Sequence, residues 1–489
     1  SKELMKLPEN TIQRAIVGIS RITDRKMKLS SVEKTVRDAI SLVGGIDKYV
    51  REGQIVALKP NQTLFKLATD GSTTSPRMIQ ALIKICKEAG AKDVWVMEAA
   101  GHAQMTRHVC AITGMTSAVK EAGGRMIFLD EIAHKVVDFG EDARVRFMPV
   151  PEVLDRVDVI INCPKAKTHF VDPISCACKN WVGLMPMNTR LELQRDADPY
   201  YWGNAQLLKR YRPTLNICDG MVAGQGQGPG SNKPFWWGYI LASDDPVAMD
   251  VTLAQLFSLD WKNIRMAKEA AELGVGVYNP RCIEIAGVPI KKAQVDVEPA
   301  DTGVNKYPCR VIVGEGANIE GTLGHWKTIA DAWLDAGLWK LFTSKGTPTI
   351  MFGNAEDPDF EKHVKEGPYI VLDDSAQDKY KFDHRVTYIP GNPVPQSYMQ
   401  HEMVEGMGFG QLYEPGLRLY EQGKKYKGQA LGAAGEQARK RAIAGGVIAA
   451  TITAAAIAIP AIVSGRQAVE SQQEEEEEQE ERVKVQHGI

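Results

Sequence analysis

Amines, an imidazole and thiols gather in one stretch, INCPKAKTHFVDPISCACKNWVG (residues 161–183), which directly follows a run of apolar residues. Lysine ammonium groups bind carboxylates and phosphates, and histidine exchanges protons near neutral pH. The spacing therefore predicts an anion-binding site that includes His169 and Lys179. The expected substrate-binding residues of the stretch are Lys165, Lys167 and Asn180.

The cysteines of this stretch suggest a second kind of chemistry. Cys163, Cys176 and Cys178 lack the spacing of ferredoxin cluster ligands, so we interpret them as small buried hydrophobic residues. An iron-sulfur cluster held by these residues or by Cys218 is the less favoured alternative. The chain has 8 cysteines in 489 residues, a density far below that of secreted disulfide scaffolds, and reduced thiols are expected. No metal ligand is assigned from the sequence.

Polar residues follow other apolar stretches as well. KPN contains Lys59 and Asn61, and CDGMVAGQGQGPG contains Asp219 and Gly228. All four are expected to bind substrate, because ligands of open α/β sheets bind beyond the carboxyl ends of the strands. His102, in EAAGH, is an expected acid or base, with helix capping as the alternative. The glycine-rich stretch either cradles a phosphate or forms a flexible lid, and it matches neither the Walker nor the Rossmann fingerprint.

The elements that must position these residues follow an alternating pattern. Three times a helical pattern ends at glycine, the usual position just past a helix end, and leads into an apolar strand. The pairs are VEKTVRDAISLVGG with QIVALKP, PRMIQALIKICKEAG with DVWVMEA, and TSAVKEAGG with RMIFLDE, and further strands are expected at VDVIINC, TLNICDG and GYILAS. The alternation predicts an α/β fold with a mostly parallel sheet and flanking helices.

A helix is also expected within the opening stretch. Asp172 would cap it, and Pro173 would occupy its first position. Helical spacing then places Cys176, Lys179, Asn180 and Gly183 on one face. The two polar residues would border the same anion-binding site as the lysines and the histidine that precede the helix.

The chain divides into segments of different composition. We expect a first α/β domain over residues 1–295 and, after a polar linker, a second, smaller α/β domain over residues 305–400. A helical connector (401–441), a single transmembrane helix (442–465) and an acidic disordered tail (466–489) are expected to follow.

The membrane prediction rests on AIAGGVIAATITAAAIAIPAIVSG, which has no charged residue and is long enough to cross a bilayer. Basic residues precede it and an acidic run follows, so the positive-inside rule predicts a single-pass protein of the cell membrane with its bulk on the cytoplasmic side. The alternative is an alanine-rich helix buried in an oligomer. Small residues four apart, such as Gly445 and Ala449, favour self-association. The expected partners are therefore membrane lipid and a homo-oligomer or a larger membrane complex.

Composition excludes some function classes. The formal net charge is −2 at pH 7, which argues against a nucleic-acid binder, since such proteins carry a strongly basic face. The N-terminal residues SKELMKLPENTIQ contain no apolar export signal, so the main body is expected to stay in the cytoplasm.

Together these motifs resemble the family catalogued as domain of unknown function 362. The resemblance lies in KPN after an early strand, PKAKTH after a middle strand, KNWVG, DG with a later GP, and DPVAMD, all in one order over about residues 14–290. Many members of that family also carry a ferredoxin-like cluster segment, which this sequence lacks. The resemblance implies an α/β domain but no activity.

The order of residues more remotely resembles nickel-pincer lactate racemases. Those enzymes have GxH after an early strand and later a histidine followed ten positions on by a lysine, a layout that His102, His169 and Lys179 fit. The resemblance implies two histidines acting as acid and base on a 2-hydroxy acid, and a lysine that carries a cofactor. The family's nickel-binding histidine follows shortly after its lysine, whereas here no histidine occurs between His169 and His325.

Three functions are compatible with these patterns. The first is a membrane-anchored enzyme acting on a small anionic ligand by proton or hydride transfer, as a racemase, epimerase or oxidoreductase does, with a lysine-linked or metal cofactor as an option. The second is an iron-sulfur or electron-transfer subunit, and the third is a scaffold subunit of a membrane complex. The lysines and the histidine favour the first.

Overall fold

The computed structural model describes residues 14–101 and 104–410. The chain forms two compact units, the first comprising Ser1–Gly303 and Asn318–Gly324 and the second Val304–Ala317 and His325–Ile489. His102, the expected transmembrane helix (442–465), the acidic tail and most of the expected connector lie outside the described residues. Within the described ranges, no helix is both long and apolar enough to cross a membrane.

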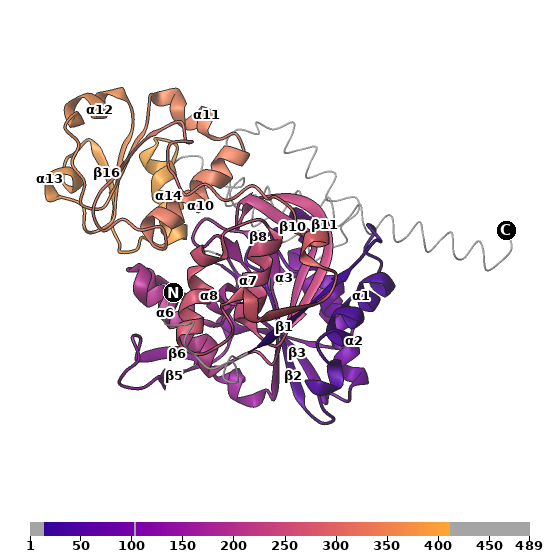
Figure 1. The fold of residues 1–489 in the computed structure, drawn as a ribbon. Coiled ribbons are helices and arrows are strands. Elements are labelled where there is room, and N and C mark those ends of the chain that lie inside the picture. The colour runs from indigo at the N-terminus through magenta and orange to yellow at the C-terminus, as the bar shows by residue number, and fades with distance from the viewer. Residues whose placement is uncertain (1–13, 102–103, 411–489) are drawn as a thin grey trace. The chain divides into compact units, whose positions relative to one another are not determined.

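The first unit is built on a ten-stranded sheet whose main path has the order β12-β1-β11-β10-β7-β2-β3-β4 (Figure 1). The neighbours β12/β1, β10/β7, β7/β2, β2/β3 and β3/β4 are parallel, and only β11 runs against its two neighbours on this path. The predicted α/β class with a mostly parallel sheet is therefore confirmed. The strands are β1 (Ala15–Arg21), β2 (Ile55–Pro60), β3 (Asp93–Glu98), β4 (Arg125–Phe128), β7 (Val159–Cys163), β8 (Lys165–Thr168), β9 (Ile174–Ser175), β10 (Leu215–Gln227), β11 (Ser231–Ser243) and β12 (Ile283–Gly287).

Helices cover the sheet, and apolar side chains fill the space on both of its faces. They are α1 (Leu29–Ser41), α2 (Pro76–Glu88), α3 (Thr106–Ile112), α4 (Met115–Glu121), α5 (Met187–Leu193), α6 (Ala197–Arg210), α7 (Pro246–Leu256), α8 (Arg265–Glu272) and α9 (Ile290–Ala293). Successive side chains of β2 point to opposite faces of the sheet, so Val56 and Leu58 lie in one core cluster while Ala57 lies in another. A separate hairpin is formed by β5 (His134–Asp138) and β6 (Phe147–Pro151).

The second unit has its own four-stranded parallel sheet in the order β13-β14-β15-β16. Its strands are β13 (Arg310–Val313), β14 (Thr349–Phe352), β15 (Tyr369–Leu372) and β16 (Val386–Ile389), accompanied by α11 (Trp339–Phe342), α12 (Phe360–Glu366), α13 (Asp378–Lys381) and α14 (Gln396–Gly406). Helix α10 (Thr322–Asp335) begins in the first unit and continues in the second.

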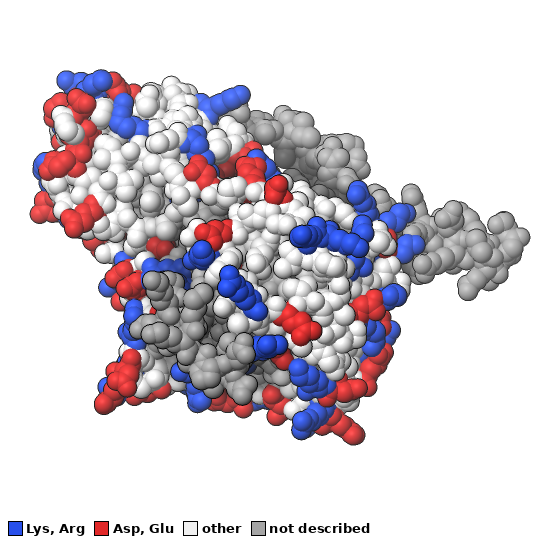
Figure 2. All heavy atoms as spheres, viewed as in Figure 1, with Lys and Arg blue, Asp and Glu red and all other residues white. Residues whose placement is uncertain are grey.

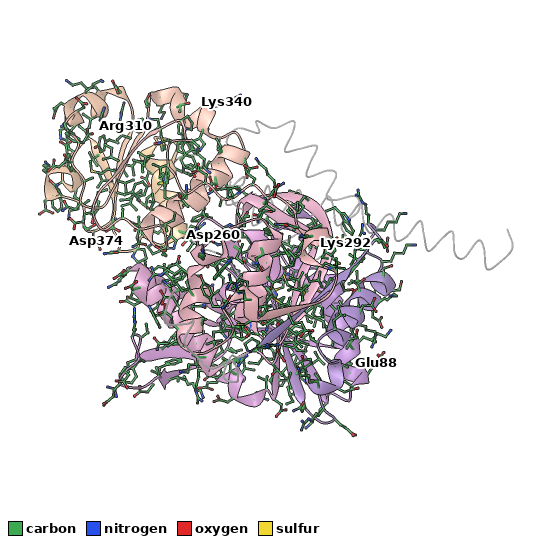
Figure 3. The ribbon with its side chains drawn as sticks, in the orientation of Figure 1. Glu88, Asp260, Lys292, Arg310, Lys340 and Asp374 are labelled. Atoms are coloured by element: carbon green, nitrogen blue, oxygen red, sulfur yellow. The ribbon has the colours of Figure 1, made fainter. Side chains whose placement is uncertain are left out.

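Charged side chains at the surface are mixed in sign. On the face drawn in Figure 2, lysines and arginines alternate with aspartates and glutamates. Glu88 and Lys292, labelled in Figure 3, are exposed at the periphery of the first unit, and Glu88 pairs with Arg37 at 2.5 Å. Such exposed pairs contribute about 0–1 kcal/mol, so the buried charges of the interior are the informative ones.

The helix predicted to begin at Pro173 is wrong. Residues Ile174–Ser175 form β9, which pairs antiparallel with β8, and a short 3₁₀ helix follows only at Lys179–Leu184. The reason lies in the side chain of Asp172, which accepts the backbone N–H groups of Arg265 (2.8 Å) and Met266 (3.3 Å). Asp172 therefore accepts the free N–H groups at the start of α8 and does not cap a helix after Pro173.

Most of the glycine-rich stretch is regular β-structure. Strand β10 continues through it to Gln227 and pairs with β11 along both strands. Gly228 is needed where this hairpin passes over β8, because a Cβ at this position would lie 1.9 Å from the carbonyl oxygen of Thr168. Glycine is required here by this close backbone approach, and the substrate-binding role of Gly228 stays a prediction.

Candidate functional site

Two of the predicted lysines are neutralised by buried carboxylates. Nζ of Lys59 lies 2.5 Å from Oε1 of Glu98, and both side chains are almost fully buried (1% and 2% exposed). Burial raises the pKa of Glu98 and lowers the pKa of Lys59, and the attraction between the two groups opposes both changes. A Cβ at Gly183 would lie 2.8 Å from Nζ of Lys59, which explains the glycine of the KNWVG motif.

The second neutralised lysine is Lys165. Its Nζ lies 3.0 Å from Oδ2 of Asp219, and Asp219 also accepts the backbone N–H groups of Ser75 (2.8 Å) and Met221 (3.1 Å). The strand pairing that places Asp219 beside Lys165 in β10 and β8 produces this contact. Lys165 and Asp219 thus neutralise each other's charge, and Asp219 also binds the backbone just before α2.

Lys167 and Lys179 have no such partner. Nζ of Lys167 donates to Oδ1 of Asn61 (2.9 Å) and to the carbonyl of Ser72 (2.5 Å), and Nζ of Lys179 donates to the hydroxyl of Tyr200 (2.9 Å). Among the described residues, no carboxylate forms an ion pair with either lysine. Burial and the positive charges of Lys165 and Lys179 lower the pKa of Lys167 to about 7.

His169 lies in the field of both unpaired lysines. Burial, followed by the charges of Lys179 and Lys167, holds the pKa of His169 well below its usual range, so the ring is neutral. Its Nδ1 accepts the backbone N–H of Val171 at 3.0 Å, and the ring proton is therefore on Nε2. In this arrangement His169 offers a hydrogen-bond donor, and it becomes a proton acceptor only if the bond to Val171 breaks.

Asparagines connect the lysines. Nδ2 of Asn61 donates to Oδ1 of Asn180 (3.0 Å), and Nδ2 of Asn180 donates to Oδ1 of Asn162 (2.8 Å) and to the carbonyl of Lys59 (3.0 Å). The structure thus brings Lys167, Asn61 and Asn180 together as predicted. Lys59, Lys165 and Asp219 lie in closed ion pairs nearby, and the position of His102 is not among the described residues.

The motif DPVAMD also has a positioning role. Asp245 caps α7 by accepting the N–H of Ala248 (2.8 Å). Asp250, within α7, accepts the N–H groups of Ala177 (2.7 Å) and Cys178 (3.1 Å). This carboxylate fixes the backbone that leads into Lys179, and burial raises its pKa to about 7.

A third buried cation without a paired carboxylate among the described residues, Arg190, was missed by sequence reasoning. Arg190, 3% exposed, donates to the carbonyls of Met185 (2.8 Å), Ala100 (2.6 Å) and Ala99 (3.2 Å). No carboxylate of the described residues forms an ion pair with it. Arg190 lies on α5, far from any strand end in the sequence, so no local signal identified it. Glu98, by contrast, directly precedes the AAGH residues and could have been found.

The cysteines do not gather as a ligand set. Sγ atoms of Cys176 and Cys218 lie 3.6 Å apart, and burial raises the pKa values of Cys163, Cys176 and Cys178 well above the usual range. Within the described residues, the one group of three or more potential ligands whose atoms lie within 4.8 Å of one another is His401, Glu402 and Glu405.

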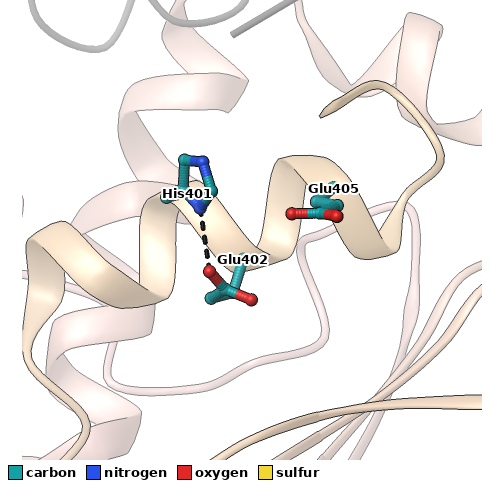
Figure 4. A group of neighbouring side chains, drawn as sticks. All are labelled: His401, Glu402 and Glu405. Carbon is teal, nitrogen blue, oxygen red and sulfur yellow. Dashed lines mark hydrogen bonds and ion pairs between the residues drawn. The ribbon is translucent and has the colours of Figure 1, made fainter. Parts of the chain in front are cut away.

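That group lies on α14 of the second unit (Figure 4), where Nδ1 of His401 is 2.8 Å from Oε1 of Glu402. All three residues come from consecutive turns of one helix. The nickel group implied by the remoter resemblance does not fit the residues around Lys179, because no histidine lies between this lysine and His325, and burial raises the pKa of the adjacent Cys178 thiol well above its usual range.

Comparison with known proteins finds a family match within the first unit. The model of the family described as Domain of unknown function (DUF362) matches residues 56–255. This segment contains all the motifs on which the predicted resemblance rests, so that resemblance is confirmed for it. A thylakoid-associated protein of Synechocystis sp. is 25% identical over 281 residues, which are 55% of this chain and 83% of that protein.

Solved structures give weaker likenesses. The lactate racemase apoprotein from Thermoanaerobacterium thermosaccharolyticum aligns with a TM-score of 0.35 and 12% identity, covering 82% of this chain and 92% of that one. A protein from Thermotoga maritima aligns with a TM-score of 0.30 and 12% identity, covering 70% and 76% of the two chains.

Proposed function

We propose that the first unit is an enzyme that binds a small carboxylate or phosphate at Lys167, His169 and Lys179, which we call the anion site. The observation that carries this proposal is the presence of two buried ammonium groups without a carboxylate partner among the described residues. Two neighbouring lysines, Lys59 and Lys165, each have a carboxylate within 3.0 Å. The contrast supports a ligand as the source of the missing negative charge.

Electrostatics favours a ligand with more than one negative charge. An uncompensated buried charge costs several kcal/mol of free energy even after the structure relaxes. A well-placed charge of opposite sign offsets this cost. Lys167 and Lys179 together can carry two positive charges that no carboxylate of the described residues pairs with. A phosphate monoester or a dicarboxylate balances this excess better than a monocarboxylate does.

The chemistry supported best is proton transfer. A lysine with a pKa of about 7 exchanges a proton readily at neutral pH, and Lys167 is therefore the titrating group in our proposal. His169 supplies Nε2–H to an oxygen of the bound anion. This differs from the expected acid–base role of His169, because Nδ1 is engaged by the backbone of Val171.

Binding of simple anions tests the proposal. Calorimetric titration with phosphate, malate and lactate at pH 6.5 should show binding by the wild type. Lys179→Met and Lys167→Met should each weaken it about 10- to 100-fold, the usual loss for one hydrogen bond to a charged group. Lys84→Met removes an exposed lysine and should leave the affinity unchanged. Absence of binding of all three anions to the folded wild type contradicts the proposal.

We also propose that the protein associates with a membrane through residues 442–465, which lie outside the described ranges. The support is the uncharged apolar stretch itself and the name of the thylakoid-associated relative. Membrane fractionation with an alkaline wash should retain the whole chain in the pellet and release a variant lacking residues 442–465. Equal release of both would contradict the proposal.

A further inference from the structure

A continuous chain of side-chain amides runs from the sheet interior to Lys167. Its members are the buried asparagines Asn216, Asn162, Asn180 and Asn61. The hydrogen bonds are Lys167 Nζ to Asn61 Oδ1 (2.9 Å), Asn61 Nδ2 to Asn180 Oδ1 (3.0 Å), Asn180 Nδ2 to Asn162 Oδ1 (2.8 Å), Asn162 Nδ2 to Asn216 Oδ1 (3.0 Å) and Asn216 Nδ2 to the carbonyl of Ser243 (3.0 Å). No other side-chain type interrupts it.

The direction of the chain is fixed at both ends. An ammonium group can only donate, so Asn61 must turn its oxygen toward Lys167. At the far end the carbonyl of Ser243 can only accept, so Asn216 must turn its nitrogen toward it. Both ends demand the same orientation of every amide between them, and reversing any one amide places two donors or two acceptors face to face.

This direction matters for the charge on Lys167. Each amide points its negative, oxygen end toward the ammonium group. Hydrogen bonds in such a chain polarise one another and are stronger in a low-dielectric interior than in water. Asn61 Oδ1 is therefore a better acceptor for Lys167 than an isolated amide oxygen would be.

We propose that Asn162 and Asn216, neither of which bonds to Lys167, are positioning residues that favour the charged form of Lys167 and thereby influence the pH range of anion binding. The functional part of this inference rests on the proposed anion site. The other charges that act on Lys167 are those of Lys165, Lys179 and Glu98, while His169 is neutral. The uncharged amide chain favours the charged form of Lys167, whereas the positive charges of Lys165 and Lys179 disfavour it.

The experiment reads Lys167 directly. The whole chain is labelled with [ε-13C]lysine, the Lys167 resonance is assigned by its loss in Lys167→Met, and its titration is followed from pH 5 to 10 without added anion. Asn162→Leu should lower the proton affinity of Lys167 by about threefold or more, because a hydrogen bond that favours the charged form is weakened. Asn216→Leu, one amide further away, should have the same sign and a smaller size.

Gln206→Leu is the matched control. Gln206 is a buried amide that accepts the N–H of Val145 (3.0 Å) and donates to the carbonyl of Val145 (3.0 Å), and it is not part of the chain, so its variant should titrate like the wild type. An unchanged Lys167 titration in Asn162→Leu and Asn216→Leu, with thermal unfolding like that of Gln206→Leu, overturns the proposal. If Asn162→Leu does not fold, the Lys167 titration in Asn216→Leu alone tests the proposal.

A second measurement separates this inference from the proposed function. Sulfate keeps its charge across the pH range, so its binding curve follows the protein alone. The pH midpoint of sulfate binding should shift downward in Asn162→Leu together with the Lys167 titration. Failure of the wild type to bind sulfate, combined with a shifted Lys167 titration, contradicts the anion site and supports the amide chain.

Discussion

Asp250 in helix α7 accepts the backbone N–H of Cys178 at 3.1 Å, one residue before Lys179. The same carboxylate accepts the N–H of Ala177. One side chain thus determines where the chain enters the 3₁₀ helix that carries Lys179 and Asn180. The geometry of the anion site therefore depends on a residue that belongs to the packing of α7.

Asp250→Leu tests whether this carboxylate supports both the stability of the fold and the geometry of the anion site. The variant leaves two buried N–H groups without an acceptor, at a cost of about 1–3 kcal/mol each in the free energy of unfolding. We expect lower stability in urea denaturation and weaker phosphate binding by calorimetry. Asp260→Leu removes an acceptor at an exposed turn and should change stability by less than a third as much. Equal losses in the two variants would contradict the assignment.

The buried ion pair of Lys59 and Glu98 gives a second prediction. Glu98→Gln leaves an uncompensated ammonium group in the interior and should lower the free energy of unfolding by about 3–5 kcal/mol. The double variant Lys59→Met with Glu98→Gln should recover part of that loss, because no charge remains buried there. Chemical denaturation of the two single variants and the double variant forms a cycle, and additive losses would show that the pair is uncoupled.

Gly183 tests the close packing around the same pair. Its substitution by alanine places a methyl group against Nζ of Lys59, and overpacking of this kind costs about 1–3 kcal/mol. In the Lys59→Met background the added methyl group meets a flexible apolar side chain, so the cost should be smaller. A Gly183→Ala loss that is equally large in both backgrounds would place the strain elsewhere.

The pKa of Lys167 predicts a dependence of stability on pH. Its pKa is about 7 in the folded protein against 10.5 for the unperturbed side chain. Between these values the unfolded chain binds more protons, so the contribution of Lys167 to stability rises with pH from about 7 to about 10.5. Relative to Lys167→Met, the wild type should be more stable at pH 9 than at pH 6.5. A pH-independent difference between the two proteins would refute the shifted pKa.

Anion binding should have the opposite dependence. The charged form of Lys167 attracts the ligand, and this form is lost as the pH rises through about 7. Sulfate affinity should therefore be higher at pH 6 than at pH 9, as isothermal titration can show. In Lys167→Met the affinity should be low at both pH values, which distinguishes this lysine from a general effect of protein charge.

Much of the first sheet could be predicted from sequence because its strands are locally apolar. The apolar run Val159–Cys163 is buried on both faces, and glycines follow the ends of α1, α2 and α4. The cluster of Lys167, Lys179 and Asn180 was also visible, since its members lie close together in the chain. These features depend on neighbours in sequence, which patterns record well.

Partnerships across long sequence separations could not be predicted. Glu98 is 39 residues from Lys59, Asp219 is 54 from Lys165, and Asp172 accepts an N–H group 93 residues away. A lysine with a buried carboxylate and one without it look the same in the sequence. The helix expected at Pro173 failed for this reason, because the cap residue was used by another helix.

The amide chain crosses the sheet from strand to strand. Asn162 is the registered neighbour of Asn216, and Asn216 is the registered neighbour of Ser243. A slip of one residue in β7 or β10 would turn its asparagine to the opposite face of the sheet. Lys167 would then lose its amide support even if the strands remained paired. The titration of Lys167 therefore reports the strand register. A molecule in which Lys167 titrates as it does in the native fold has paired β7, β10 and β11 in the correct register.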